Sequence, residues 1–496
     1  MLAAQIFIKV IDLALMLILA RILAPTDFAL VAMAMIFIQF AETVLEVPVA
    51  QALIRTPSLN QRMLDTAFTI SILRALIVMV AGLCFAPIAV IIFSEPRLAA
   101  LIAVLSFAAA FRGVVNPRLV MYARDLNYFP EAILTALAKA IAAAAAIPIA
   151  LSTGSYWSLV VLPVLTPLMM TIGSFCIVWY RPRFSLKEWP IFSNMIGWTS
   201  VSQIFVAANW QADMFIFAQS APRDLVGKFS VSRQLAGAPF QVFVAPIERP
   251  FLAAFSHLGP GKEIQDGYLR ASAAIFTLVS PILGLIFAFS DPIVAVLFSE
   301  AWTGAALFLK VMVCAVIVLL PTESISSLVL SLDRAKFNAI HAGLGVATKL
   351  PLIYFGLQIF GVNGFLAGQF IASVLLVSIG ACIVKHLIGL PLLTQLKSYF
   401  RAIVGNLVLV SISLFALQFV AVTSNLLLIV VCLAIGAVAF AAYWAVVMAI
   451  WFVAGRPQGV EQMIIDYLAM AMRRFGRIGA DEATLDATFE GDKGTN

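Results

Sequence analysis

Charged side chains occur at intervals inside stretches of this sequence that are otherwise apolar. Nine are basic and six are acidic: Lys9, Arg74, Arg112, Lys139, Lys228, Arg233, Arg249, Lys310, Lys349, Asp12, Glu42, Glu46, Asp213, Glu248 and Glu323. A charge at the centre of a lipid bilayer costs about 2.5–3.5 kcal/mol or more, so it must face a partner, a water-filled cavity or the membrane interface. These fifteen charged residues therefore predict a protein that binds or moves an ion or a charged substrate inside a membrane.

Five of the basic residues lie well inside their apolar stretches: Arg74, Arg112, Lys139, Arg233 and Lys349. We predict that they line a water-filled, net-positive cavity that takes an anion through the membrane. Arginine suits phosphate because its planar fork donates to two oxygens at once. The alternative interpretation is that these cations form buried ion pairs that hold helices together. Lys9 and Asp12, three positions apart, are expected to form such a pair locally.

The acidic candidates for cavity lining or ion coupling are Glu42, Glu46, Asp213 and Glu323. Gln39, Glu42 and Glu46 share one face at helical spacing, which favours a position along the cavity wall. A further hypothesis is that Glu42, Asp213 or Glu323 carries a coupling proton or sodium ion. Close to Asp213, the sequence also offers a polar and aromatic surface of a kind that contacts sugars, made of Gln203, Asn209, Trp210 and Gln211.

Motifs of the common enzyme classes are missing from the sequence. It contains no GxSxG, P-loop or HExxH motif. The five cysteines are scattered singly and the three histidines are far apart, so neither a disulfide nor a metal site is expected. The basic residues do not cluster on one polar surface, which argues against nucleic-acid binding. The sequence thus predicts a transporter without a cofactor rather than an enzyme.

The composition requires a lipid environment. Of the 496 residues, 63% are hydrophobic and 11% are charged, and the mean hydropathy is +1.05, whereas soluble domains contain about 25% charged residues. Stretches long enough to cross a hydrocarbon core of about 30 Å recur throughout the chain. We predict an all-α polytopic membrane protein with about fourteen spans, at residues 2–22, 27–54, 65–93, 97–121, 129–152, 155–180, 191–219, 224–256, 268–290, 302–331, 336–359, 361–384, 397–421 and 425–453.

Basic residues alternate between the connections of these spans. The connections after even-numbered spans and the C-terminal tail hold 19 lysines and arginines, whereas those after odd-numbered spans hold only Arg21, Arg97 and Arg223. An excess of basic residues marks the cytoplasmic side, so both termini are predicted to be cytoplasmic. Residues 456–496 are predicted to form an amphipathic helix on the cytoplasmic headgroups, followed by an acidic, disordered tail.

The chain also repeats itself at an offset of about 200 residues. Pro87–Glu95 resembles Pro292–Glu300, and Lys139 corresponds to Lys349. Weak internal similarity of this kind is typical of transporters. Each repeat has six spans, so the two halves should be related by an axis along the membrane normal. The predicted units are an N-lobe (1–187), a C-lobe (188–390), two further helices (391–455) and the cytoplasmic segment (456–496).

Several short motifs carry a resemblance to a known family. Ala20–Val31, with the sequence ARILAPTDFALV, resembles the opening of Wzx-type polysaccharide flippases of the multidrug/oligosaccharidyl-lipid/polysaccharide exporter superfamily. Further matches lie at Ala52–Arg55, Asp65–Phe68, Phe93–Pro96 and Ser155–Val160. Their order and spacing extend the resemblance over the first six spans.

This resemblance implies two six-helix lobes that form a V and open alternately to each side of the bacterial inner membrane. The implied cargo is an undecaprenyl-diphosphate-linked oligosaccharide for exopolysaccharide, capsule or lipopolysaccharide O-antigen assembly. The implied partners are membrane lipids, a polysaccharide polymerase and a chain-length regulator. One alternative is a cation-coupled multidrug extruder of the same superfamily, although an acidic cavity would suit it better. The other, a membrane polysaccharide polymerase, would require a longer outer loop than any predicted here.

Overall fold

The computed structural model describes residues 2–47, 49–56, 59–125, 127, 129–193, 197–420, 424–456 and 459–462. Every regular element among them is a helix. Nine of the described helices are long and apolar enough to cross a membrane, or ten if the bent pair Arg97–Gly113 and Pro117–Arg124 forms one span. The all-α polytopic membrane fold is thus confirmed, whereas the number fourteen stays a prediction. From residue 463 on, the predicted amphipathic helix and acidic tail lie outside the described residues.

The first half of the chain contains six long helices and four short ones. Their bounds are α1 Leu2–Ile22, α2 Pro25–Val44, α3 Val49–Arg55, α4 Gln61–Phe93, α5 Arg97–Gly113, η1 Pro117–Leu119, α6 Val120–Arg124, α7 Phe129–Thr153, α8 Trp157–Ile177 and α9 Trp189–Ser193.

The second half repeats this pattern with more interruptions. The bounds are α10 Gly197–Ser220, α11 Arg223–Pro239, η2 Phe240–Val244, η3 Ala245–Ile247, α12 Glu248–Ser256, α13 Lys262–Ala288, α14 Ser290–Leu297, η4 Glu300–Trp302, α15 Ala305–Leu319, η5 Leu320–Thr322, α16 Glu323–Ser331, α17 Lys336–Ile388, α18 Leu392–Leu417 and α19 Asn425–Val453. The element η2 is a π-helical turn directly after Pro239, where the proline removes a backbone donor.

Local sequence explains where α2 begins. Pro25 occupies the first turn, where its missing N–H would have no helical partner. The Asp27 carboxylate then accepts a hydrogen bond from the Ala24 backbone N–H at 3.0 Å, and an acidic group in the first turn also suits the helix dipole. The same Pro-x-Asp sequence recurs at α11, where Pro222 is the residue before the helix and Asp224 lies in its first turn.

The long helix α17 is a hairpin of two antiparallel helices. Gly361 has φ 59° and ψ −143°, a conformation that breaks the helix and that only glycine adopts readily. On either side of it the backbones touch, since a Cβ on Gly356 would lie 2.4 Å from the Gly364 carbonyl oxygen. Likewise, a Cβ on Gly368 would lie 2.6 Å from the Leu352 carbonyl oxygen. Small residues therefore permit this close packing.

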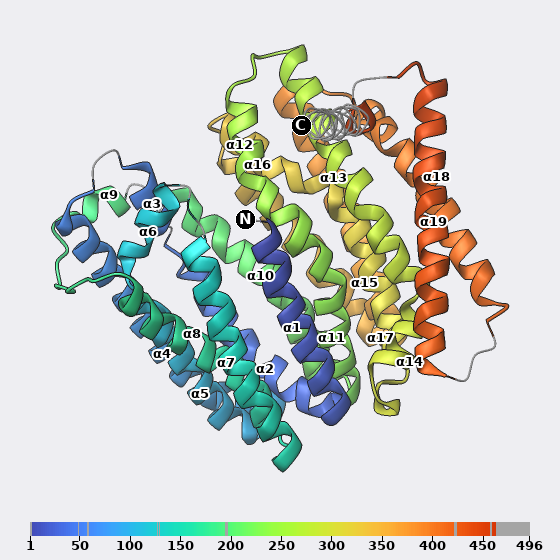
Figure 1. The fold of residues 1–496 in the computed structure, drawn as a ribbon. Helices are drawn as coiled ribbons and strands as arrows, with labels where there is room; N and C mark the ends of the chain where they lie inside the picture. The colour runs from blue at the N-terminus through green and yellow to red at the C-terminus, as the bar shows by residue number, and fades with distance from the viewer. Residues whose placement is uncertain are drawn as a thin grey trace, which may run out of the picture.

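The helices form two groups, which we call the N-lobe (α1–α8) and the C-lobe (α10–α17). Within the N-lobe α4 packs on α5 and α7 on α8; within the C-lobe α10 packs on α17 and α11 on α15. The lobes meet mainly where α2 contacts α10 and α11. In Figure 1 their helices lie together at the end near the start of α2 and diverge toward the end that carries α3, α6 and α9 on one side and α12 and α16 on the other.

The last two helices, α18 and α19, pack on each other and on α13 of the C-lobe. The Asn406 amide donates to Ser280 Oγ at 2.6 Å, and the Tyr443 hydroxyl donates to the Thr277 carbonyl at 2.7 Å. This pair thus extends the C-lobe outward (Figure 1).

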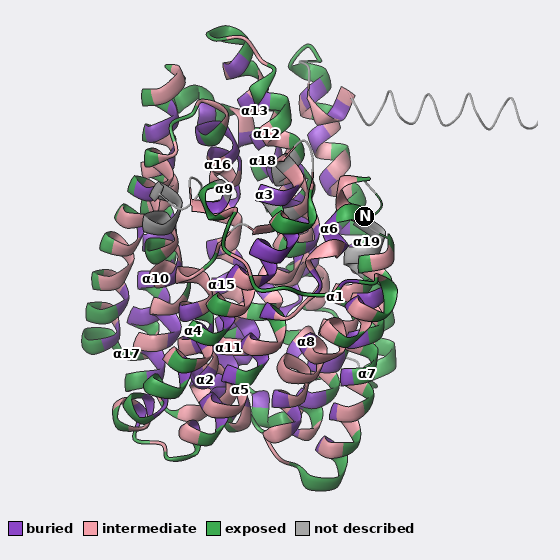
Figure 2. Cartoon of the chain, turned by 90° about the vertical axis from the view of Figure 1, so that its left-hand side faces the viewer, coloured by how far each residue is buried: buried purple, intermediate pink, exposed green. Residues whose placement is uncertain are grey.

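The distribution of exposed residues matches a protein surrounded by lipid. In Figure 2, buried residues lie between the helices and exposed ones follow the outward helix faces. Many exposed side chains are large and apolar; Ile91 on α4 is 78% exposed and Leu433 on α19 is 69% exposed. A soluble surface would not present such a continuous apolar coat. The helices therefore expose large apolar side chains on their outward faces, as expected of a surface that contacts lipid.

Candidate functional site

The N-lobe brings two of the predicted cations to one acidic residue. Arg112 on α5 forms an ion pair with the Glu42 carboxylate on α2. Arg74 on α4 donates from Nη2 to the Glu42 backbone carbonyl at 2.9 Å. The Arg74 Nε is buried and has no hydrogen-bond partner, although a buried donor left unsatisfied is costly. We call Glu42, Arg74 and Arg112 the Glu42 cluster.

The C-lobe contains a second arrangement of two basic side chains around one acidic residue. Asp213 on α10 lies 3.2 Å from Arg233 on α11 and 3.2 Å from Lys349 on α17. The Gln369 amide on the second half of α17 also donates to Asp213 at 2.8 Å. The Asp213 side chain is only 5% exposed, so its charge depends on these partners rather than on water. We call Asp213, Arg233 and Lys349 the Asp213 cluster.

Arg233 and Lys349 are held in place by further contacts. Arg233 donates to the Trp210 carbonyl and lies 5.9 Å from the centre of the Trp210 ring, a distance suited to a cation–π contact. Lys349 donates to the Asn209 carbonyl at 2.9 Å. The cations are therefore oriented by α10, while a quarter of the Arg233 side chain stays exposed.

Lys139 lies in a third cluster, inside the N-lobe. Its ammonium on α7 is 2.5 Å from the Asp12 carboxylate on α1. The predicted pair of Lys9 and Asp12 is present at 3.6 Å, but Lys139 is the closer partner. Sequence spacing pointed to the neighbour three positions away, whereas tertiary packing of α1 on α7 brings in the residue 127 positions away. We call Lys9, Asp12 and Lys139 the Asp12 cluster.

The three clusters share one ratio of charges. Each places two cations on a single acidic residue, through its side chain or, for Arg74, its backbone carbonyl. The alternative interpretation, ion pairs between helices, describes the contacts of Arg112, Lys139, Arg233 and Lys349. That interpretation still leaves a net positive charge in each cluster. The ratio suits a site in which an incoming anion completes the charge balance.

Glu42 and Asp213 belong to α2 and α10, two helices of opposite lobes that also make a polar contact with each other. Gln211 donates to Gln39 at 3.0 Å, and Gln203 lies 3.5 Å from Glu46. One member of each pair belongs to the N-lobe and the other to the C-lobe. The polar face of α2 predicted from helical spacing thus lies against the polar stretch of α10, and Glu46 takes part in it as an exposed residue.

The remaining predicted residues lie elsewhere. Glu323 is the first residue of α16, and its assignment stays a prediction. Lys228 forms an ion pair with Asp224 at 3.4 Å on its own helix. The side chains of Glu248 and Arg249 lie outside the described part of the chain.

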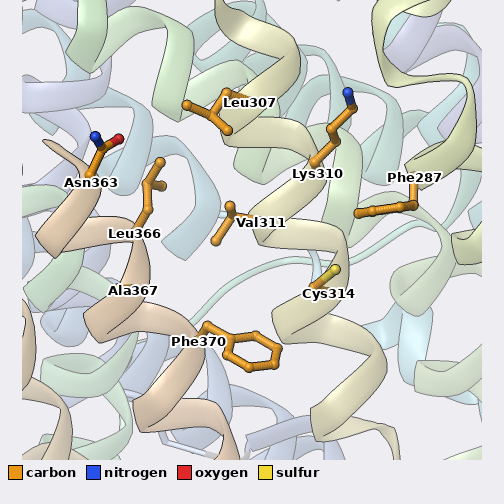
Figure 3. A pocket seen from close by; sticks show the side chains of 9 residues that line it. All are labelled: Phe287, Leu307, Lys310, Val311, Cys314, Asn363, Leu366, Ala367 and Phe370. Atoms are coloured by element: carbon orange, nitrogen blue, oxygen red, sulfur yellow. The ribbon is translucent and has the colours of Figure 1, made fainter.

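Lys310 forms an ion pair with Asp291 at 2.5 Å, at the rim of a groove of about 350 Å³ that lies between α13, α15 and α17. Figure 3 shows Lys310 and Asn363 at one end of this groove, with Phe370 and Cys314 toward the other end. Its lining includes none of the five cations predicted to bind the anion. It is therefore separate from the three clusters, and Lys310 serves below as a control.

Comparison with known proteins agrees with this architecture. The profile of the Polysacc_synt_3 family, described as polysaccharide biosynthesis protein, matches residues 18–307. The chain belongs to this family. The predicted resemblance to polysaccharide flippases is thereby confirmed, and the matched region contains the Glu42 cluster, Lys139, Asp213 and Arg233.

Two relatives have names from polysaccharide pathways. The succinoglycan biosynthesis transport protein ExoT of Rhizobium meliloti is 23% identical over 291 residues, which cover 58% of this chain and 59% of ExoT. The lipopolysaccharide biosynthesis protein WzxC of Escherichia coli is 21% identical over 385 residues, which cover 75% of this chain and 77% of WzxC. The match to ExoT therefore spans about three fifths of that relative's length.

Solved structures share the fold at lower sequence identity. The lipid II flippase MurJ in an inward closed conformation superposes with a TM-score of 0.65 at 15% identity, covering 89% of this chain and 98% of MurJ. An inward-facing multidrug transporter of the MATE family gives a TM-score of 0.57 at 16% identity, covering 78% and 95%. The two-lobed helical fold of these exporters is thus the fold of this chain.

Proposed function

We propose that this protein is a flippase that moves oligosaccharides linked to undecaprenyl diphosphate across the bacterial inner membrane for polysaccharide assembly. The observation that carries the proposal is the excess of cations in the Glu42 and Asp213 clusters, one in each lobe, whose acidic residues lie on the contacting helices α2 and α10. A diphosphate has the opposite charge and the oxygen geometry that arginine recognises. The polysaccharide names of the relatives support the choice of cargo.

The clusters suggest how the cargo is held without being trapped. In the unloaded protein, Glu42 and Asp213 neutralise part of each cluster's charge. A cargo phosphate that enters replaces these carboxylates as the acceptor of arginine hydrogen bonds, and the carboxylates compete for the same donors when the cargo leaves. Exposed Trp210 and the Gln39–Gln211 pair offer ring and amide surfaces to the sugar.

The orientation follows from the distribution of basic residues. The 19 basic residues that are predicted on one side against three on the other support cytoplasmic termini. Cargo would enter from the cytoplasmic leaflet, toward which the two lobes diverge (Figure 1). Coupling to a proton or sodium ion through Glu42, Asp213 or Glu323, and assembly with a polymerase and a chain-length regulator, are part of this proposal. The proposal includes no catalytic step.

An export assay tests the site assignment. We expect Arg112→Ala and Arg233→Ala each to abolish polymer export in a strain that depends on this gene, while the protein still reaches the membrane. Lys310→Ala is the matched control, because it removes an equally charged residue that lies in the separate groove. Wild-type export from both arginine variants would overturn the site assignment.

The second candidate function is cation-coupled drug efflux, which the shared fold with the multidrug transporter favours. Drug accumulation in cells that express the protein separates the two functions. Efflux of cationic drugs, together with normal polymer export in a deletion strain, would reverse the ranking.

A further inference from the structure

We propose that Arg21 and Arg223 form a reciprocal latch, in which each lobe's arginine binds the end of a helix in the other lobe and so holds the lobes closed on one side. This proposal rests on the proposed function only in that a flippase must open this side to release its cargo. The latch lies at the end of the molecule where α1 joins α2 and where α10 joins α11, opposite the end that carries α3, α6 and α9 (Figure 1).

The first half of the latch starts from the N-lobe. Arg21 near the end of α1 donates from Nε to the Leu297 carbonyl at 3.2 Å and from Nη2 to the Val296 carbonyl. Both acceptors are in the last turn of α14, which ends at Leu297. The last carbonyls of a helix have no partner within it and carry the negative end of its dipole. A guanidinium therefore supplies both the hydrogen bonds and the charge that this helix end requires.

The second half starts from the C-lobe. Arg223, the first residue of α11, donates from Nη2 to the Phe93 carbonyl at 2.5 Å. Phe93 is the last residue of α4. The other terminal nitrogen, Nη1, lies 2.9 Å from the Met33 sulfur on α2. Arg223 thus caps α4 of the N-lobe in the way that Arg21 caps α14 of the C-lobe.

The internal repeat relates the two halves. Arg21 and Arg223 come from the same helix junction of the two lobes but not from aligned positions, because Ala24–Asp27 corresponds to Ala221–Asp224 at an offset of 197. The capped helices end in its best-matched segment, Pro87–Glu95 in α4 and Pro292–Glu300 in α14. Each lobe therefore presents an arginine from the same helix junction to the same helix end of its counterpart. Two related contacts made in opposite directions are expected of lobes that a pseudo-twofold axis relates.

Close packing surrounds the latch. The Trp302 indole N–H donates to the Ala20 carbonyl at 2.8 Å across the lobes, and the ring is fully buried against Phe28 at 5.1 Å between ring centres. A Cβ on Gly227 of α11 would lie 1.8 Å from the Pro25 carbonyl oxygen of α2. Two helix backbones this close exclude a passage between them on this side.

The distribution of charge gives independent support. The connections on this side contain only Arg21, Arg97 and Arg223, as expected of the side that disfavours basic residues. Two of these three, Arg21 and Arg223, make contacts between the lobes. Arg97 instead pairs with Glu95 in its own lobe at 2.7 Å, and this guanidinium lowers the pKa of the Glu95 carboxyl. Arg97 is therefore a natural control, with the same charge at the same end and no contact in the latch.

Distance measurements between spin labels test the latch. The five native cysteines are replaced, and cysteines are introduced at Ser152 and Thr303, which are exposed at this end in the N-lobe and C-lobe respectively. We expect R21A/R223A in lipid nanodiscs without cargo to add a population at longer distance that is absent from the parent and from R97A. R21K/R223K should fall between them, because lysine donates to a carbonyl but lacks the fork.

Two outcomes overturn the proposal. One is a distance distribution in R21A/R223A that matches that of the parent protein. The other is a simultaneous change between labels at Ser152 and Ala100, both in the N-lobe, because this would mean that the arginines hold a lobe's own fold rather than the lobes together. Neither measurement contains cargo, so failure of the latch and failure of the proposed cargo are distinguishable. Cargo binding is measured separately, with a diphosphate lipid.

Discussion

Lys349 lies 3.2 Å from Asp213 in the C-lobe, and the repeat-related Lys139 lies 2.5 Å from Asp12 in the N-lobe. Asp213 follows Asp12 by 201 positions, and Lys349 follows Lys139 by 210. The ion pair between α1 and α7 in the N-lobe thus has a counterpart between α10 and the first half of α17 in the C-lobe. The pairs differ in their third member, Lys9 in one case and Arg233 in the other.

Replacement of Asp213 by Asn should destabilise the protein strongly. It leaves Arg233 and Lys349 near each other without their shared anion, and removal of one partner from a buried pair costs about 3–5 kcal/mol. The free energy of unfolding, measured by thermal or denaturant unfolding in detergent, reports the loss. Asp12→Asn is the comparison, with a smaller expected loss because the Asp12 side chain is 15% exposed against 5% for Asp213. Equal stability of Asp213→Asn and the parent would contradict the role of Asp213 as the shared counter-ion.

The Glu42→Gln variant should bind an anionic lipid more tightly than the parent. The carboxylate that competes for Arg112 is gone, so a cargo phosphate meets two cations without a rival. We expect the Kd for a diphosphate lipid to fall about tenfold, the equivalent of about 1.4 kcal/mol, and polymer export to slow because release becomes harder. Binding is measured by titration in detergent. A weaker affinity would instead favour the purely structural interpretation of this ion pair.

Arg112→Lys should weaken binding of a diphosphate lipid although the charge is retained. Lysine is a point charge and lacks the planar fork that donates to two phosphate oxygens. Loss of one charge-assisted hydrogen bond of about 1.5–3 kcal/mol corresponds to roughly a 10- to 100-fold rise in Kd. Lys310→Arg is the control, since the groove that contains Lys310 lies apart from the clusters, and its Kd should match the parent's. A similar shift in both variants would point to a general effect of surface charge.

Gly361→Ala should destabilise the hairpin of α17. The backbone there has φ 59° and ψ −143°, a region that costs a residue with a Cβ about 1–3 kcal/mol. The apparent melting temperature in detergent should therefore fall. Gly343→Ala is the matched control, because its Cβ would meet only the Phe205 ring, at 3.8 Å. If both variants melt at the same temperature, the break at Gly361 does not depend on glycine.

The sequence predicted the fold because membrane physics leaves few options. Apolar stretches that contain few charges must be helices, since a helix satisfies its backbone hydrogen bonds within one segment. The same reasoning selected the basic residues of the candidate site, because a charge inside an apolar stretch must have a partner, a cavity or the membrane interface beside it. The repeat was also legible, in Pro87–Glu95 and Pro292–Glu300.

The sequence did not reveal which residues are the partners of those charges. Local spacing predicted Lys9 as the partner of Asp12, and the pair exists, but Lys139 from α7 is closer. Gln369 as a donor to Asp213 had no signal in the sequence, because 156 residues separate the two. The repeat relates Asp12 to Asp213 and Lys139 to Lys349, so one ion pair implies the other. That either pair forms at all became known only from the packing of the helices.

The amino-acid sequence alone determined that this chain spans a membrane, that its halves are related, and which residues carry charge into the apolar interior. The tertiary structure alone decided which cation meets which acid, and that Arg21 and Arg223 cap helices of opposite lobes. The physical reason is the range of each constraint. Transfer into lipid acts on every residue separately and can be read position by position, whereas an ion pair or a capped helix end depends on how helices far apart in sequence are oriented against one another.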